Sequence, residues 1–251
     1  MIDVHEHDQV RELRLARPPV NALNPALMGA LRDAIARAVA DGKTALLLSG
    51  GPGMFTAGLD VPELLTLDPV GLRAMWELFF ALLSDLAHCP IPIGAALTGH
   101  SPAGGTVLAL YADHRVMADG PKYRIGLNEV QVGLPVPGVL LRALTFLCGE
   151  RQAARLATGG LLIDPAEALR VGLVDEVAPE AEVVPRALAW AKELASRPPT
   201  ALRLTRALAR RPLCDAFAAV DPAMLDGVVA QWFSQETQAV LQALVARLRK
   251  R

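Results

Sequence analysis

Glu129 is the carboxylate of this chain whose surroundings best suit acid–base chemistry. It ends the segment 126–129, and apolar residues such as Ile125, Leu127 and Val130 stand around it. A carboxyl group among apolar residues either finds a polar partner or has its pKa raised. A raised pKa suits a general base that works near neutral pH. Glu129 is therefore a candidate base, and the alternative is an ordinary glutamate that faces solvent from a loop.

Two segments rich in small residues could stabilise a developing negative charge. In Phe55–Val61, Ala57 and Gly58 would let a ligand approach the backbone closely enough for N–H groups to point at an oxygen. The segment Thr98–Gly105 ends in Pro-Ala-Gly-Gly, where a helix is expected to begin. The first N–H groups of a helix have no acceptor within it, and the helix dipole is positive there. Each segment taken alone could equally be a turn, or close packing of a helix on a strand.

The elements that must position these segments alternate between strand and helix. Strands are expected at 10–16, 44–49, 91–97 and 115–118, and helices at 25–40, 69–88 and 104–111. Asn24 is a suitable cap for the first helix, and Pro25 suits its first turn. Beyond about residue 149 the chain is expected to be helical, apart from a short strand near 173–177. This alternation predicts an α/β architecture.

The helical end of the chain is expected to be amphipathic. Near residues 202–210, leucines such as Leu204 and Leu208 occupy one face, and Arg206 and Arg210 lie opposite them. A helix with such an apolar face usually packs on a neighbour, either within the chain or across an oligomer.

Composition excludes several classes of function. The 251 residues carry a net charge of -1, so a basic surface for nucleic acid is not expected. The three cysteines lie too far apart for a metal or redox motif. The first eight residues are charged where a signal peptide would be apolar, and the most apolar long stretch, 75–97, is interrupted by charges and prolines. We therefore expect a cytoplasmic protein with neither a membrane nor a nucleic acid as partner.

Several segments, taken together and in order, carry a resemblance to a known family. They are Pro18–Asn24, Ala57–Val61, Pro102–Gly105 followed by Asp113, and Pro165–Asp175. At this spacing they resemble the crotonase (enoyl-CoA hydratase/isomerase) superfamily. The resemblance implies an α/β fold with a ββα spiral core over residues 1–195 and a helical trimerisation region over 196–251. It also implies an acyl-CoA substrate, assembly as a homotrimer or hexamer, and no metal or other cofactor, since coenzyme A is part of the substrate.

The number of carboxylates at the expected site positions distinguishes hydratases from isomerases within this superfamily. Hydratases of this superfamily carry one glutamate two residues after the glycine pair and a second about twenty residues later. Here the first position is Val107 and the second is Glu129. The pattern with one glutamate, with Pro-Ala-Gly-Gly and Gly-Leu-Asn-Glu, resembles the Δ3,Δ2-enoyl-CoA isomerases of fatty-acid oxidation. Moving a double bond needs one base, which removes a proton from C2 and returns one to C4, and Glu129 would be that base.

The resemblance also assigns the other site residues. The backbone N–H groups of Leu59 and Gly104 would form an oxyanion hole for the thioester oxygen. Substrate contacts would come from Ala57, Gly58, Leu59, Asp60, Val61 and Asn128. The apolar side chain of Val107 is expected to keep water from being positioned for addition.

Other functions stay open at this stage. The chain could be an enoyl-CoA hydratase, another crotonase-type enzyme such as a decarboxylase, thioesterase or dehalogenase, or an acyl-CoA binder without turnover. Gly99-His100-Ser101 also looks like the nucleophile turn of α/β-hydrolases. That fold needs an acid and then a histidine after the serine, and His114 is the last histidine of the chain, thirteen residues beyond Ser101. His100 could instead cap the turn or face the acyl group.

Overall fold

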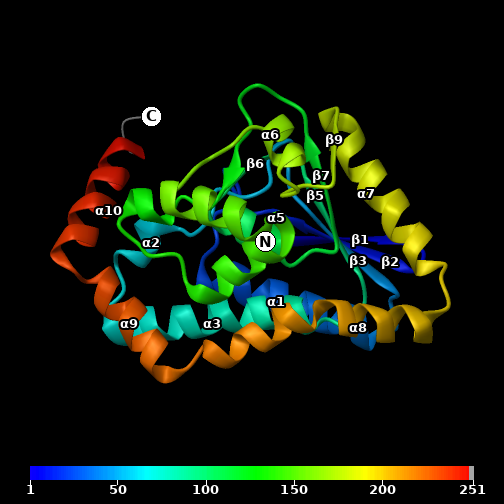
Figure 1. Cartoon of the computed structure of the whole chain (residues 1–251), viewed down its shortest axis with the longest axis horizontal. Coiled ribbons are helices and arrows are strands. Elements are labelled where there is room, and N and C mark those ends of the chain that lie inside the picture. Colours follow the sequence, from blue (N-terminus) through cyan, green and yellow to red (C-terminus); the bar gives the residue numbers. More distant parts are fainter. Residues whose placement is uncertain (249–251) are drawn as a thin grey trace.

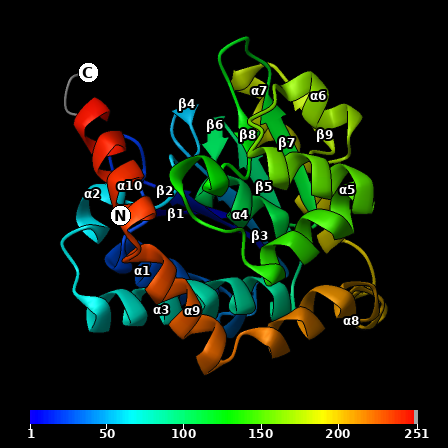
Figure 2. The same cartoon turned by 60° about the vertical axis from the view of Figure 1, so that its left-hand side comes forward.

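Two sheets form the centre of the computed structural model, which describes residues 1–248 (Figures 1 and 2). The large sheet has six strands in the order β1-β2-β3-β5-β7-β9, and every pair except β1–β2 is parallel. Its strands are β1 (Ile2–His7), β2 (Val10–Leu15), β3 (Ala45–Ser49), β5 (Ile93–Leu97), β7 (His114–Ala118) and β9 (Glu176–Ala178). The small sheet pairs β4 (Gly53–Met54), β6 (Gly99–Pro102) and β8 (Ile125–Gly126).

The chain winds repeatedly through both sheets and then into a helix. β3 leads to β4 and then to the helices α2 (Val61–Leu64) and α3 (Pro69–His88). β5 leads to β6 and α4 (Gly104–Leu110). β7 leads to β8, the 3₁₀ helix η1 (Glu129–Val132) and α5 (Gly138–Gly159). This repetition is the expected ββα spiral.

The remaining helices cover the faces of the spiral. They are α1 (Pro25–Ala40), α6 (Pro165–Arg170), α7 (Glu180–Ala195), α8 (Pro199–Asp215), the 3₁₀ helix η2 (Ala216–Ala219), α9 (Pro222–Trp232) and α10 (Gln235–Leu248). α7 packs Val183, Ala187 and Ala191 on one face of the large sheet, and α1, α3 and α4 contribute to the larger apolar cluster on the other. α8, α9 and α10 run as one continuous arm around the molecule (Figure 1). Within residues 1–248 none of the helices combines the length and hydropathy that crossing a membrane requires.

Local sequence explains where these elements begin. β3 and β5 are buried along their whole length, as the apolar runs Ala-Leu-Leu-Leu-Ser and Ile-Gly-Ala-Ala-Leu favour in a parallel sheet. Several helices share the same N-terminal capping arrangement. An Asn or Asp side chain accepts a hydrogen bond from the backbone N–H three residues later, and a proline lies in the first turn. The capping residues are Asn24, Asp60, Asp68, Asp164 and Asp221.

The structure confirms the expected elements up to residue 118 within two residues at each end, and it adds the strands β1, β4 and β6 and the short helix α2, which were not expected. β1 is exposed over most of its length and pairs with β2 alone, so it is an edge strand without an alternating apolar pattern. The last strand is also placed differently, at Glu176–Ala178, because Leu173 and Val174 form a buried turn after α6.

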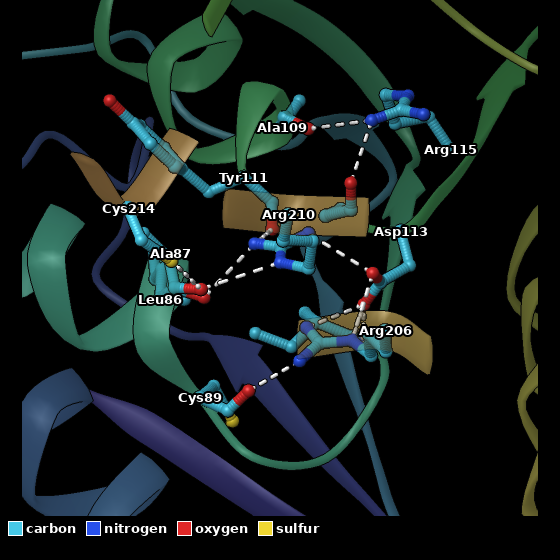
Figure 3. Close-up of polar contacts among 12 residues, drawn as sticks. Leu86, Ala87, Cys89, Ala109, Tyr111, Asp113, Arg115, Arg206, Arg210 and Cys214 are labelled. Carbon is cyan, nitrogen blue, oxygen red and sulfur yellow. Dashed lines mark hydrogen bonds and ion pairs between the residues drawn. The ribbon is translucent and has the colours of Figure 1, made fainter. Parts of the chain in front are cut away.

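Within the single chain, α8 buries its arginine face and leaves its apolar face exposed, so that face does not pack on a neighbouring element of the same chain. Leu204 and Leu208 are 58% and 71% exposed, while Arg206 and Arg210 point into the protein. Both arginines bind Asp113, at the start of β7, with N···O distances of 2.8 to 3.0 Å (Figure 3). Arg210 also donates to the carbonyl of Tyr111 at 2.8 Å, and Arg206 donates to that of Cys89. Within this chain, charge pairing determines which face of α8 is buried.

Candidate active site

The segment Arg17–Asn24 holds the first small-residue loop in place. The side chain of Asn21 accepts a hydrogen bond from Arg17 N at 2.9 Å and donates to Phe55 O at 3.0 Å. Thr56 Oγ1 donates back to Asn21 O at 2.7 Å. Leu23 N donates to Gly58 O at 2.8 Å, so the loop is fixed by both backbone and side chains.

One N–H group of this loop is left free. The N–H of Ala57 donates to Val20 O, that of Gly58 to Thr56 Oγ1, that of Asp60 to Leu23 O, and that of Val61 to Leu59 O. The N–H of Leu59 donates to no acceptor within residues 1–248. Among these five consecutive residues, the hydrogen bonds thus leave free the N–H of Leu59, the residue that the family resemblance assigns to the oxyanion hole.

The second loop touches the first at a pair of glycines. A Cβ built on Gly104 would lie 2.9 Å from the Cα of Gly58, and one built on Gly58 would lie 3.0 Å from the nitrogen of Gly104. Gly58 also has a φ of +90°, which residues with side chains rarely adopt. The absence of side chains at both positions lets the two backbones meet.

Gly104 offers a second free donor beside the first loop. It is the first residue of α4, and its N–H finds no acceptor in the described part of the chain. Ala103 precedes it with a φ of +46° and provides no side-chain cap. At the other end of α4, the buried Arg115 donates to Ala112 O at 2.8 Å and Ala109 O at 3.4 Å (Figure 3). α4 is therefore held at its C-terminal end while its N-terminal N–H stays open.

Thr106 connects α4 to the segment that carries Glu129. Its hydroxyl lies 2.6 Å from Ser101 O and 3.0 Å from Gly126 O, and it accepts a hydrogen bond from Gly126 N at 2.7 Å. Ala103 N donates to Gly126 O at 2.9 Å. The segment 126–129 is thus fixed directly against the residues that present the Gly104 N–H.

Glu129 begins η1 with an unpartnered carboxyl oxygen. Its Oε2 atom is buried and has no hydrogen-bond partner within residues 1–248. Burial raises the pKa of this carboxyl to about 7. The neighbouring Asn128 also has a buried side-chain oxygen without a partner in the described residues, and its side chain does not cap η1. A base with such a pKa exchanges protons readily near neutral pH.

The side chains of Asp60, Val107 and His100 contact other parts of the protein. The carboxylate of Asp60 binds Arg17 at 2.8 Å and accepts from Glu63 N at 3.2 Å, so its side chain is already engaged. Val107 is fully buried in the main apolar cluster. His100 packs edge-on against the ring of Tyr123, with 5.7 Å between centroids, and burial lowers its pKa.

Residues 5–240 match the model of the enoyl-CoA hydratase/isomerase family. The chain belongs to this family. It is 33% identical to human mitochondrial enoyl-CoA delta isomerase 1 over 243 residues, which are 96% of this chain and 80% of the human one. The crystal structure of human mitochondrial Δ3,Δ2-enoyl-CoA isomerase matches the present fold with a TM-score of 0.95 over 99% of this chain and 98% of that one, at 33% identity. The crotonase fold is thereby confirmed.

The family also holds relatives with the other named activity. A probable enoyl-CoA hydratase, echA17 of Mycobacterium avium, is 35% identical over 199 residues, or 78% of this chain and 76% of that protein. The similarity in sequence and fold to the human enzyme supports isomerase activity, and the site residues give an independent argument between the two reactions. Here the helix α4 carries Val107, and Glu129 supplies the carboxylate.

The sequence did not reveal the residues that support this site. Asn21, Thr106 and Arg115 act through hydrogen bonds to backbone atoms between 3 and 34 residues away. Thr106, a polar residue at the start of an otherwise apolar helix, was the signal available for one of them.

Proposed function

We propose that the protein is a Δ3,Δ2-enoyl-CoA isomerase, which moves the double bond of a 3-enoyl-CoA thioester to the trans-2 position during fatty-acid β-oxidation. The observation that carries the proposal is the buried carboxyl of Glu129, whose Oε2 has no partner within residues 1–248, fixed to the same helix start as the N–H of Gly104, which is free within those residues. The similarity in sequence and fold to the human isomerase supports the same assignment.

The reaction consists of two proton transfers through one carboxyl group. The carboxylate of Glu129 removes a proton from C2, and the electron pair of that C–H bond forms a C1–C2 double bond while negative charge moves to the thioester oxygen. Glu129, now protonated, gives a proton to C4. The electron pair of the C3–C4 double bond forms the new C4–H bond, the C1–C2 pair becomes the C2–C3 double bond, and an electron pair on the thioester oxygen re-forms the carbonyl. Nothing is oxidised or reduced, so the balance of the reaction requires no redox cofactor and no metal.

The N–H groups of Leu59 and Gly104 stabilise the oxygen that carries the charge. Both are unused within the described chain and belong to loops in direct contact. Fixed donors of this kind stabilise the charge without reorganisation, and losing one typically costs about 3 kcal/mol of transition-state stabilisation. The backbone of Ala57–Val61 and the side chain of Asn128 provide further substrate contacts.

Val107 favours isomerisation over hydration. Adding water needs groups that orient and deprotonate the water molecule, and two carboxylates serve that purpose well. At Val107 the side chain is apolar and buried in the core. The side chain of Val107 itself offers no polar group that could hold a water molecule.

The assembly is a homotrimer or a pair of trimers, formed with the helical region 196–251. Leu204 and Leu208, exposed on the outer face of α8 in the single chain, suit such an interface. The expected cytoplasmic location stays a prediction; the human relative is named as mitochondrial.

The deciding experiment incubates the purified protein with a trans-3-enoyl-CoA in deuterated water and follows conjugation and product mass, with Glu129→Gln alongside. A conjugated 2-enoyl product without added water, abolished in the variant, supports the isomerase and its base. A product heavier by one water, formed at isomerase-like rates, would instead make the protein a hydratase and overturn the role given to Val107. Acyl-CoA binding with no turnover would reject both.

A further inference from the structure

We propose that Thr237, on the C-terminal helix α10, is a positioning residue for Glu129 and acts through the 3₁₀ helix η1. The inference rests on the proposed role of Glu129 as the base. The C-terminal arm would then influence the reaction by positioning the base, and it would contribute no reacting group.

The carboxyl of Glu129 depends on its backbone for its direction. Because Oε2 has no hydrogen-bond partner in the described chain, no neighbouring side chain holds that oxygen in place. The aim of the carboxyl is therefore determined by the placement of η1, which is four residues long.

η1 ends at a glycine in a left-handed conformation. Gly133 has φ +76° and ψ +16°, and its N–H lies 3.3 Å from the carbonyl of Val130. The next residue, Leu134, donates to the carbonyl of Glu129 itself at 3.0 Å. A shift of Gly133 is therefore transmitted directly to the backbone of Glu129.

Thr237 holds Gly133 from the other end of the chain. Its hydroxyl is fully buried and donates to Gly133 O at 2.6 Å, across 104 residues of sequence. The same hydroxyl oxygen accepts from Gln231 Nε2 at 3.1 Å and from Ser234 Oγ at 3.0 Å, so both lone pairs are used. A Cβ built on Gly133 would lie 3.1 Å from the Cα of Thr237. The contact thus joins backbone to backbone with no room between.

A second contact, from Gln131, secures η1. Gln131 Nε2 donates to Gly160 O, at the end of α5, at 2.7 Å. With Gln131 attached to α5, losing the Thr237 hydroxyl would leave η1 free to rotate about the remaining contact. A displacement of about 1 Å at a reacting group can reduce a rate by up to about a hundredfold.

The test compares Thr237→Val, which keeps the shape and removes the hydroxyl, with Thr237→Ser, which keeps the hydroxyl. We expect kcat for 3-enoyl-CoA isomerisation to fall roughly tenfold to a hundredfold in Thr237→Val, with KM within about twofold, because most of the proposed substrate contacts lie on the separate loop 57–61. Thr237→Ser should restore most of kcat. An unchanged kcat in Thr237→Val, or an equal loss in both variants, would overturn the proposal.

Asp221→Ala is the matched control for stability. Asp221 caps α9 by accepting from Met224 N at 2.8 Å, and the removal of this cap weakens the arm away from Gly133. The control should lower the unfolding temperature and keep kcat, whereas a parallel loss of kcat would reduce Thr237 to a general structural role. If Thr237→Val does not fold, Thr237→Ala removes the same hydroxyl, and a kcat equal to wild type in that variant would refute the proposal.

Glu129→Gln distinguishes failure of this inference from failure of the proposed function. An active Glu129→Gln protein would reject Glu129 as the base and the inference with it. An inactive one, combined with full activity in Thr237→Val, would reject the role of Thr237 alone.

Discussion

Replacing Glu129 by glutamine is expected to remove the activity and to stabilise the fold, because the same buried carboxyl governs both. Glutamine has nearly the same shape and cannot accept the C2 proton. It also carries no charge, so it is not subject to the cost of burying a carboxylate without a partner.

The size of the stabilisation follows from the pKa of Glu129. Burial raises this pKa from its ordinary value of 4.5 to about 7. Between these two pH values the folded protein keeps a proton that the unfolded chain has released, so stability falls as the pH rises through this window. The fall is complete above pH 7 and amounts to about 3 kcal/mol, since each pKa unit corresponds to about 1.4 kcal/mol. Glu129→Gln has no such fall.

Urea denaturation of both proteins at pH 5, 6, 7 and 8 measures the effect at one protein concentration. From the ionisation of Glu129 alone, the free energy of unfolding of the variant should exceed that of wild type by about 1 kcal/mol at pH 5 and about 2 kcal/mol at pH 6. At pH 7 and 8 the difference should be about 3 kcal/mol. A difference that does not change with pH would show that the pKa of Glu129 is not raised in the folded protein. An active variant would refute the catalytic part of the reasoning independently.

Three further outcomes are expected. For wild type, kcat/KM should rise about tenfold per pH unit below pH 7 and level off above it, because the carboxylate form of Glu129 is the base; a pH–rate profile that is flat through pH 7 would contradict this. Gly104→Ala should reduce kcat/KM about a hundredfold or more, because the new Cβ would lie 2.9 Å from Gly58 Cα and separate the two donor loops. Steady-state kinetics measure this loss, and an unchanged circular dichroism spectrum shows that the variant is folded. Asp113→Asn should lower the free energy of unfolding by about 3 kcal/mol or more, since two buried guanidinium groups lose their shared carboxylate; thermal and urea unfolding measure it.

Local signals in the sequence were sufficient for most of the elements. Asn24 followed by Pro25 predicts the start of α1, and the fully apolar runs of β3 and β5 predict buried strands. β1 carries no such signal, because an exposed edge strand can be charged throughout. Local sequence also could not predict which face of α8 is buried, because this depends on Asp113, which lies 93 residues before Arg206.

Site residues could be predicted where the residue type itself indicates a chemical role. Glu129 among apolar neighbours and the glycine at position 104 could be selected from the sequence, while the direction of the carboxyl could not. That direction depends on Gly133 and Thr237, whose types are ordinary for a turn and a helix start. Likewise, the hydrogen bonds that leave the N–H of Leu59 without an acceptor within residues 1–248 could not be predicted from the sequence.

The contact between Gly58 and Gly104 also has a consequence for how this site can change over generations. Each glycine excludes a side chain at the other position, because an added Cβ at either one meets the backbone of its partner. A single substitution at one position therefore displaces both loops, and a second substitution at the other cannot compensate by restoring space. The two positions are therefore sterically coupled, and a variant with a side chain at either one has to rearrange both loops.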